Sequence, residues 1–134
     1  VADIAHVLDD HQHTGTGVYP TLAGGVAVVS GVAWTLGAFV ELVPVNTITT
    51  DFDIHWLVVE NVTDDEIYEF VFYAATTEIT RVRFGAQPGV GSVITLNEVP
   101  IQMAIQRKNT QIQAKVASSG ITETVTVSLM YHIY

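Results

Sequence analysis

Residues 100–134, PIQMAIQRKNTQIQAKVASSGITETVTVSLMYHIY, alternate apolar and polar side chains almost without interruption. Successive side chains of a β-strand point to opposite faces, so the alternation predicts three consecutive strands, within residues 100–109, 110–120 and 121–134. The expected inward faces are Ile101, Met103 and Ile105, then Ile112, Ala114 and Val116, then Val125, Val127, Leu129, Tyr131 and Ile133. A C-terminus made of half-buried antiparallel strands is typical of a β-sandwich or barrel, not of a nucleotide-binding α/β core.

Short apolar runs separated by turn residues continue this pattern toward the N-terminus. We expect further strands at residues 26–30, 32–34, 38–43, 53–61, 66–75 and 78–84. The polar turn Val62-Thr63-Asp64-Asp65 joins the two most apolar of them. About eight strands with almost no helical periodicity predict an all-β fold, an antiparallel β-sandwich of the jelly-roll kind.

The first 25 residues differ from the rest because they are rich in Gly, Thr, Asp and His and show little periodicity. We therefore predict an extended N-terminal arm, residues 1–25, and a β-sandwich domain, residues 26–134. Residues 2–10 are the only helix candidate, with apolar side chains at helical spacing. So short a helix is marginal in isolation, and we expect it to become ordered against a partner.

Charge is scarce in this chain and unevenly distributed. Of its 134 residues 49% are hydrophobic and only 14% are charged, below the usual ~25%. Such a composition suggests that much of the surface is covered by copies of the same chain. The net charge of −9 argues against a nucleic-acid partner, which requires clustered Lys and Arg. Residues 1–80 hold twelve acidic side chains and no Lys or Arg. This polarity either orients subunits or reflects ordinary solvated faces.

Cysteine is absent, which excludes disulfides and thiolate metal sites. Residues 18–40 carry no charge, but Gly and Pro interrupt them repeatedly. They predict turns and short strands, and not a membrane-spanning helix. No basic segment precedes them, so we expect neither a signal peptide nor a membrane partner.

His11-Gln12-His13 is the most specific local motif. In an extended strand His11 and His13 project from the same side. Three parallel chains around an axis would present six imidazole nitrogens, an octahedral set suited to iron or another first-row transition ion. The motif resembles the His-x-His elements of trimeric phage tail fibres and spikes, which bind iron on the trimer axis. The alternative is a solvated pair of histidines in a mobile arm.

The sequence offers no catalytic residue and no residue that binds an organic cofactor. The serines lie in expected strands or simple turns without a nucleophile motif. Asp51 and Asp53 share a strand face, and residues 64–66 are acidic, but neighbours in sequence rarely form a two-carboxylate active site. The same acidic tracts are candidates for calcium. A small cupin-type metal enzyme is a further alternative, although His55 and His132 are expected on well-separated strands.

Aromatic side chains suggest a carbohydrate-binding alternative. His55-Trp56 and the aromatics of residues 68–73 resemble a sugar-stacking platform, but Trp56 aligns with Ile54 and Val58, which predicts core packing. A rival function is therefore a carbohydrate- or receptor-binding module at a fibre tip. Its candidate exposed aromatics are Tyr19, Tyr131 and Tyr134.

A Gly- and His-rich N-terminal arm and five segments carry a wider resemblance: residues 48–55, 68–73, 80–84, 114–120 and 125–134. Together they resemble structural proteins of tailed bacteriophages, namely head-decoration proteins and head- or tail-fibre domains with a jelly-roll body. The resemblance implies a non-enzymatic virion protein that decorates or stabilises a capsid or forms part of a fibre. It also implies a homotrimer whose arm contacts the major capsid protein or another virion protein. The chain would then be assembled in the host cytoplasm and reside in the virion.

Overall fold

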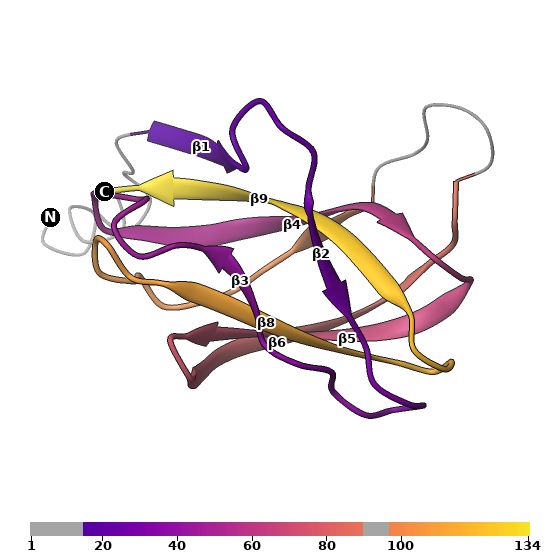
Figure 1. Ribbon diagram of the computed structural model, residues 1–134. Helices are drawn as coiled ribbons and strands as arrows, with labels where there is room; N and C mark the ends of the chain where they lie inside the picture. Colours follow the sequence, from indigo (N-terminus) through magenta and orange to yellow (C-terminus); the bar gives the residue numbers. More distant parts are fainter. Residues whose placement is uncertain (1–14, 90–96) are drawn as a thin grey trace, which may run out of the picture.

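The computed structural model describes residues 15–89 and 97–134, in which every regular element is a β-strand (Figure 1). The strands are β1 (Gly15–Tyr19), β2 (Val26–Val29), β3 (Val40–Val43), β4 (Phe52–Val62), β5 (Glu66–Ala74), β6 (Thr77–Ala86), β7 (Asn97–Pro100), β8 (Ile112–Ser118) and β9 (Thr124–Ile133). No helix long and apolar enough to cross a membrane occurs in this part of the chain.

Two antiparallel sheets pack face to face (Figure 1). One has the order β1-β9-β4-β7, with β2 paired to β9 beyond the end of β1, and the other has the order β3-β8-β5-β6. This order is that of the eight-stranded jelly roll, with β1 and β2 sharing one strand position. The predicted fold class is confirmed. The C-terminal strands are central to it, because β8 and β9 each have neighbours on both sides.

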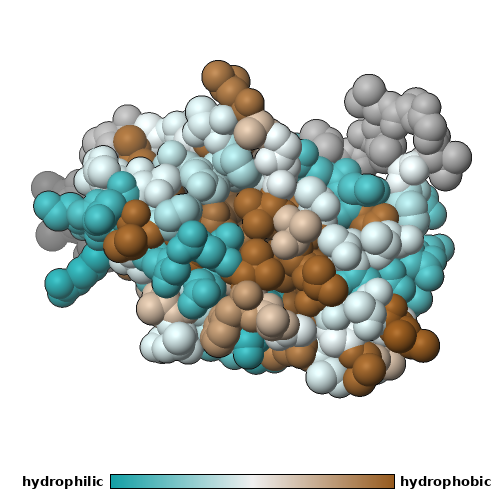
Figure 2. All heavy atoms as spheres, viewed as in Figure 1, coloured by the Kyte–Doolittle hydropathy of each residue, from teal (hydrophilic) through white to brown (hydrophobic). Residues whose placement is uncertain are grey.

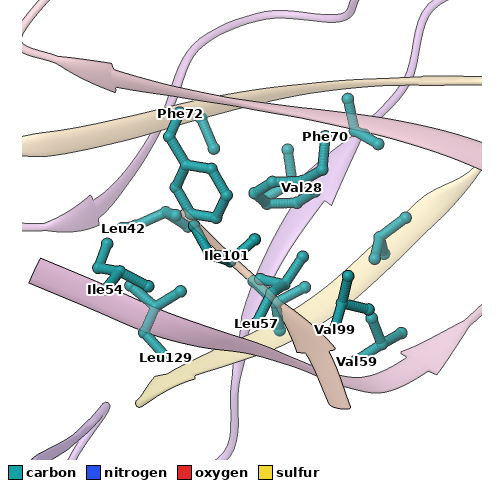
Figure 3. Packing of buried hydrophobic residues seen from close by; sticks show 14 of the residues in the cluster. Val28, Leu42, Ile54, Leu57, Val59, Phe70, Phe72, Val99, Ile101 and Leu129 are labelled. Atoms are coloured by element: carbon teal, nitrogen blue, oxygen red, sulfur yellow. The ribbon is translucent and has the colours of Figure 1, made fainter. Parts of the chain in front are cut away.

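The hydrophobic core fills the space between the sheets. Figure 3 shows Phe70 and Phe72 of β5 pointing toward Ile54, Leu57 and Leu129 of the opposite sheet. Of the predicted inward faces of the last two strands, Tyr131 and Ile133 are partly buried against the core, and the rest are buried: Ile112, Ala114, Val116, Val125, Val127 and Leu129. Burial of each Phe or Leu side chain stabilises the fold by about 1.5–3 kcal/mol, which makes this core the main source of stability.

Strand β4 contains two irregularities that change which of its residues face the core. Its register with β9 shifts between Ile54 and Trp56 and again between Val59 and Asn61. A bulge adds one residue to a strand and so reverses the alternation beyond it. Ile54 and Leu57 both face the core as a result, whereas Trp56 is half-buried and lies outside the core cluster. The prediction that Trp56 packs in the core is wrong for this reason.

The strand expected within residues 100–109 is also wrong. Strand β7 ends at Pro100. Between β7 and β8 the chain makes one isolated bridge, which pairs Gln106 with Phe52. The amide of Ile101 donates to the carbonyl of His55, the residue at the first irregularity of β4. The ladder with β4 therefore stops where that strand departs from regular geometry. Ile105, expected to face inward, is exposed.

The expected short strand at residues 32–34 is a turn. Within the predicted arm, residues 15–19 form β1, which pairs with the last strand from Gly15 opposite Ile133 to Tyr19 opposite Leu129. Gly17 lies directly against the ring of Tyr131, where a Cβ atom would collide with it. Residues 1–14, which include the helix candidate and both His11 and His13, lie outside the described ranges. The division into an arm and a sandwich therefore stays a prediction.

Candidate functional site

Three connections meet at one end of the sandwich, which we call the loop end: residues 30–39, 63–65 and 119–123 (Figure 1, right). Backbone hydrogen bonds join them. The amide of Ser30 donates to the carbonyl of Glu123 at 2.8 Å, and the amide of Thr122 donates to that of Gly31 at 3.0 Å. The loop end is therefore built from segments that are distant in the sequence.

Glycine allows the β2–β3 connection to fold back closely on the end of β2. Gly37 lies so near the carbonyl of Val29 that a Cβ atom would collide with it. Its amide donates to the carbonyl of Val116 at 3.1 Å, and the amide of Trp34 donates to that of Ser118 at 2.7 Å. These bonds hold residues 34–37 along the edge of β8 and fix the position of Trp34.

Three carboxylates converge at the loop end. One oxygen from each of Asp64, Glu66 and Glu123 lies within 4.8 Å of the others. Glu123 is buried and accepts a hydrogen bond from the hydroxyl of Thr63, whereas Glu66 accepts one from Ser119 Oγ at 2.5 Å. Such oxygens are donors of the type that Ca²⁺ prefers. The sequence indicated the acidic tract 64–66 but not Glu123, which only the β8–β9 connection brings to it.

The hydroxyl of Tyr68 lies beneath this carboxylate cluster and donates to the backbone carbonyl of Asp64 at 2.7 Å. The side chain is fully buried. Burial, together with the negative charges of Glu123, Glu66 and Asp64 and against the lowering effect of the hydrogen bond, raises the pKa of Tyr68 to about 12. Tyr68 therefore stays neutral at any ordinary pH and acts as a structural support.

Exposed apolar side chains surround the carboxylates. Six of the ten large apolar side chains exposed in the described residues belong to these connections or to the strand ends beside them, namely Val29, Val32, Trp34, Phe39, Ile67 and Ile121. Figure 2 shows hydrophobic side chains along β2 and, at the lower right, at the tip of the β2–β3 connection. Trp34 is 50% exposed and Ile121 75% exposed. The loop end thus combines an apolar rim with an acidic centre.

Polar and aromatic side chains cover the outer face of the four-stranded sheet. Glu69 binds Arg83 at 2.6 Å and Arg81 at 2.7 Å. The hydrogen bonds from Arg83, and secondly those from Arg81, hold the pKa of Glu69 below its usual value. The guanidinium of Arg83 lies 5.0 Å from the ring centre of Trp34, and Lys115 lies 4.1 Å from that of Phe39. These contacts connect the loop end to the sheet behind it.

His55 and His132 lie together on the outer face of the other sheet. Their strands, β4 and β9, are neighbours, and the two rings stack with centroids 4.4 Å apart. His132 Nδ1 is 3.8 Å from Asp53 Oδ1, and the hydroxyl of Tyr134 donates to Asp53 Oδ2 at 3.1 Å. The expectation that the two histidines are well separated is wrong. The proximity of these two histidines was not predicted because it depends on which strands pair, and no local sequence pattern shows that.

The remaining candidate residues from the sequence analysis make contacts that support the fold. Asp51 Oδ1 accepts the amide of Lys108 at 3.0 Å, whereas Asp53 accepts the hydroxyl of Tyr134. The two carboxylates therefore bind different segments and do not act as a pair. Tyr19 and Tyr131 pack against the core. The exposed aromatics of the described residues are instead Trp34 and Phe39. In the sequence, the glycines near Trp34, such as Gly37, are the only local signal that this residue lies in a connection and not in a strand.

Similarity to known proteins is limited to fold. No family model and no curated protein matches the chain. A solved structure of infectious bursal disease virus, Gt strain, is 17% identical, with a TM-score of 0.44, over 91% of this chain and 33% of the viral chain. The VP2 subviral particle of the same virus is 16% identical, with a TM-score of 0.46, over 92% and 34%. The C-terminal CBM6 of LamC, a marine laminarinase from Zobellia galactanivorans, is 12% identical, with a TM-score of 0.37, over 87% and 98%. This chain spans about a third of the length of the viral chains.

Proposed function

We propose that this chain is a non-enzymatic structural protein of a virus particle, of the tailed-bacteriophage type, which decorates or stabilises a capsid or forms part of a fibre. It acts through protein contacts made by its sandwich. The observation that carries the proposal is the loop end, where Val32, Trp34 and Ile121 are exposed on connections held rigidly by hydrogen bonds. Exposed apolar side chains that gather at one place mark contact surfaces.

The energetics support contact as the purpose of this surface. Burial of apolar surface stabilises an association by roughly 25 cal/mol per Å², offset by the cost of ordering flexible groups. The backbone bonds of Trp34 and Gly37 to β8 order the rim before any partner binds. A rim that is ordered in advance retains more of the burial energy on binding.

Immunogold electron microscopy of virus particles from the host that carries the sequence tests the proposal. We expect an antibody against the sandwich to label intact particles. Recombinant protein carrying Val32→Ser with Ile121→Ser should fail to reattach to particles stripped of the native chain. A matched control, Val18→Ser with Leu22→Ser, changes two other exposed apolar side chains away from the loop end and should reattach normally. Particles free of the chain would refute the proposal.

The homotrimer, its anchoring arm and the axial metal at His11 and His13 belong to the same proposal. Native mass spectrometry of the untagged protein tests them together. A trimer with one iron-sized adduct supports an assembly held by these histidines, and a metal-free trimer rejects the metal site alone. A stable monomer would count against both the trimer and the site.

Carbohydrate or receptor binding at a fibre tip is the second candidate function. The exposed indole of Trp34 favours it, since aromatic faces stack against sugar rings. Arg83 already lies over this ring, which leaves less of it for a ligand. A glycan array decides between the two: reproducible binding that Trp34→Ala abolishes supports the second candidate, and an array without binding favours the structural role.

A further inference from the structure

The end of the sandwich opposite the loop end has a different character. We call it the basic end. It consists of the β3–β4 connection, residues 44–51, and the segment between β7 and β8, residues 101–111 (Figure 1, left). The amide of Asn109 donates to the carbonyl of Ile48 at 2.7 Å, and the amide of Asn46 donates to that of Asn109 at 3.2 Å. The two connections therefore form one surface.

Exposed cations and apolar side chains lie together at the basic end. Arg107 and Lys108 are exposed, and Val45 and Ile105 are 59% and 54% exposed. Asp51 belongs to the same end, and its carboxylate accepts the amide of Lys108. This end thus combines two exposed cationic side chains with an apolar rim of its own.

The loop end carries the opposite charge. Asp64, Asp65, Glu66 and Glu123 belong to its connections or adjoin them, and Arg83, which lies over Trp34, is the cation beside them. The two ends of one molecule are therefore complementary both in charge and in their apolar content. Complementary potentials of this kind steer association and fix the orientation of the partners.

We propose that the occupant of the loop end is a second copy of this chain, which docks its basic end there. The inference rests on the proposed function in so far as it takes the loop end as a contact surface. Asp64 and Asp65 would face Arg107 and Lys108 of the next copy, while Trp34, Val32 and Ile121 would pack against its Val45 and Ile105. Such a contact joins two different surfaces, and it repeats until it closes into a ring or continues as a filament.

Sedimentation velocity over a concentration series tests this contact by charge exchange. The first variant, Asp64→Lys with Asp65→Lys, reverses two of the four acidic charges of the loop end and leaves the basic end unchanged. The second, Arg107→Glu with Lys108→Glu, makes both ends acidic. We expect the wild-type protein to associate and to do so less at 500 mM than at 50 mM salt, because salt screens the charges. Each variant alone should associate at least tenfold more weakly, and an equimolar mixture of the two should recover association.

The control variant is Glu98→Lys, which reverses an exposed charge in the short strand β7, away from the four substituted positions. It should associate like the wild type, and thermal unfolding should show that all variants fold. Association that neither variant weakens, or that the mixture fails to recover, overturns the head-to-tail contact. So does a wild-type chain that stays monomeric at millimolar concentration. If that monomer still attaches to virus particles through Val32 and Ile121, the proposed function stands and the partner is a different protein.

Discussion

The hydroxyl oxygens of Ser30 and Ser118 lie 3.3 Å apart inside the loop end. Both residues are almost fully buried, and Ser30 Oγ also accepts the amide of Glu123 at 2.7 Å. The Ser118 hydroxyl donates to the carbonyl of Gly120 at 3.1 Å. Two small hydroxyls thereby tie the β2–β3 and β8–β9 connections, and with them the apolar rim, to the sandwich.

Replacing Ser30 with Ala should destabilise the protein by about 1–3 kcal/mol, because the buried amide of Glu123 loses its acceptor. Urea denaturation measures the loss, and hydrogen exchange should show faster exchange of that amide. Thr35→Ala removes an exposed hydroxyl bond in the same connection and serves as the control, with an expected change below about 0.5 kcal/mol. Equal losses in the two variants would show that the buried pair does not organise the loop end.

The sequence was sufficient to predict the fold class, because period-two alternation persists wherever a strand is regular. Residues 112–118 and 124–133 form strands as expected, with the expected side chains inward. The prediction failed where a single residue breaks the period. The irregularity at His55 reversed the orientation of Trp56 and ended the pairing at Pro100. A bulge of this kind depends on tertiary contacts and has no clear local signature.

The candidate site was less predictable than the fold. The acidic tract at residues 64–66 was visible, but Glu123 joins it only through the β8–β9 connection. The stack of His55 on His132 likewise depends on the pairing of β4 with β9. A jelly roll pairs strands that are distant in the sequence, so sites formed between them cannot be derived from local patterns.

Replacing Asp64 with Asn should stabilise the protein slightly, by a few tenths of a kcal/mol up to about 1 kcal/mol. The change removes one of three carboxylates whose oxygens lie within 4.8 Å of one another, and like charges so close repel. The Tyr68 bond is kept, because it uses the backbone carbonyl. Thermal unfolding at 20 mM and 500 mM salt measures the gain, which should shrink at high salt.

Asp65→Asn is the matched control for Asp64→Asn, since Asp65 is exposed next to the cluster but does not belong to it. A smaller gain is expected there. A loss of stability in Asp64→Asn that calcium chelation reproduces in the wild type would contradict simple repulsion, since it would mean that the three carboxylates hold a cation.

Glu69→Gln should cost about 1 kcal/mol at pH 7, because Arg81 and Arg83 lose their charged acceptor. The pKa of Glu69 is lower in the folded protein than its ordinary value of 4.5, so its contribution is fully present above that value. It is lost as the pH falls through the lowered pKa. Urea denaturation at pH 7 and pH 2.5 should therefore show a difference between wild type and variant at pH 7 that nearly vanishes at pH 2.5. A difference independent of pH would assign the loss to packing and not to charge.

Tyr68→Phe should have opposite effects at neutral and alkaline pH. At pH 8 the variant loses the hydrogen bond to the carbonyl of Asp64 and should be less stable by about 1 kcal/mol. The unfolded chain ionises this tyrosine near pH 10.0, whereas burial raises the pKa of Tyr68 to about 12 in the folded state. Between these values the unfolded state binds fewer protons, so the wild-type protein loses stability as the pH rises.

The loss specific to Tyr68 approaches about 2–3 kcal/mol by pH 12, since each pH unit contributes about 1.4 kcal/mol per proton. The Tyr68→Phe variant does not lose this stability, because it has no ionisable group at position 68. Tyr73 and Tyr134, whose pKa values are also raised, lower the stability of both proteins equally. Urea denaturation at pH 8, 10, 11 and 12 should therefore show the two stability curves approach and cross. Parallel curves would mean that Tyr68 ionises as readily in the folded protein as in the unfolded chain, and would contradict the raised pKa that its burial and the nearby carboxylates produce.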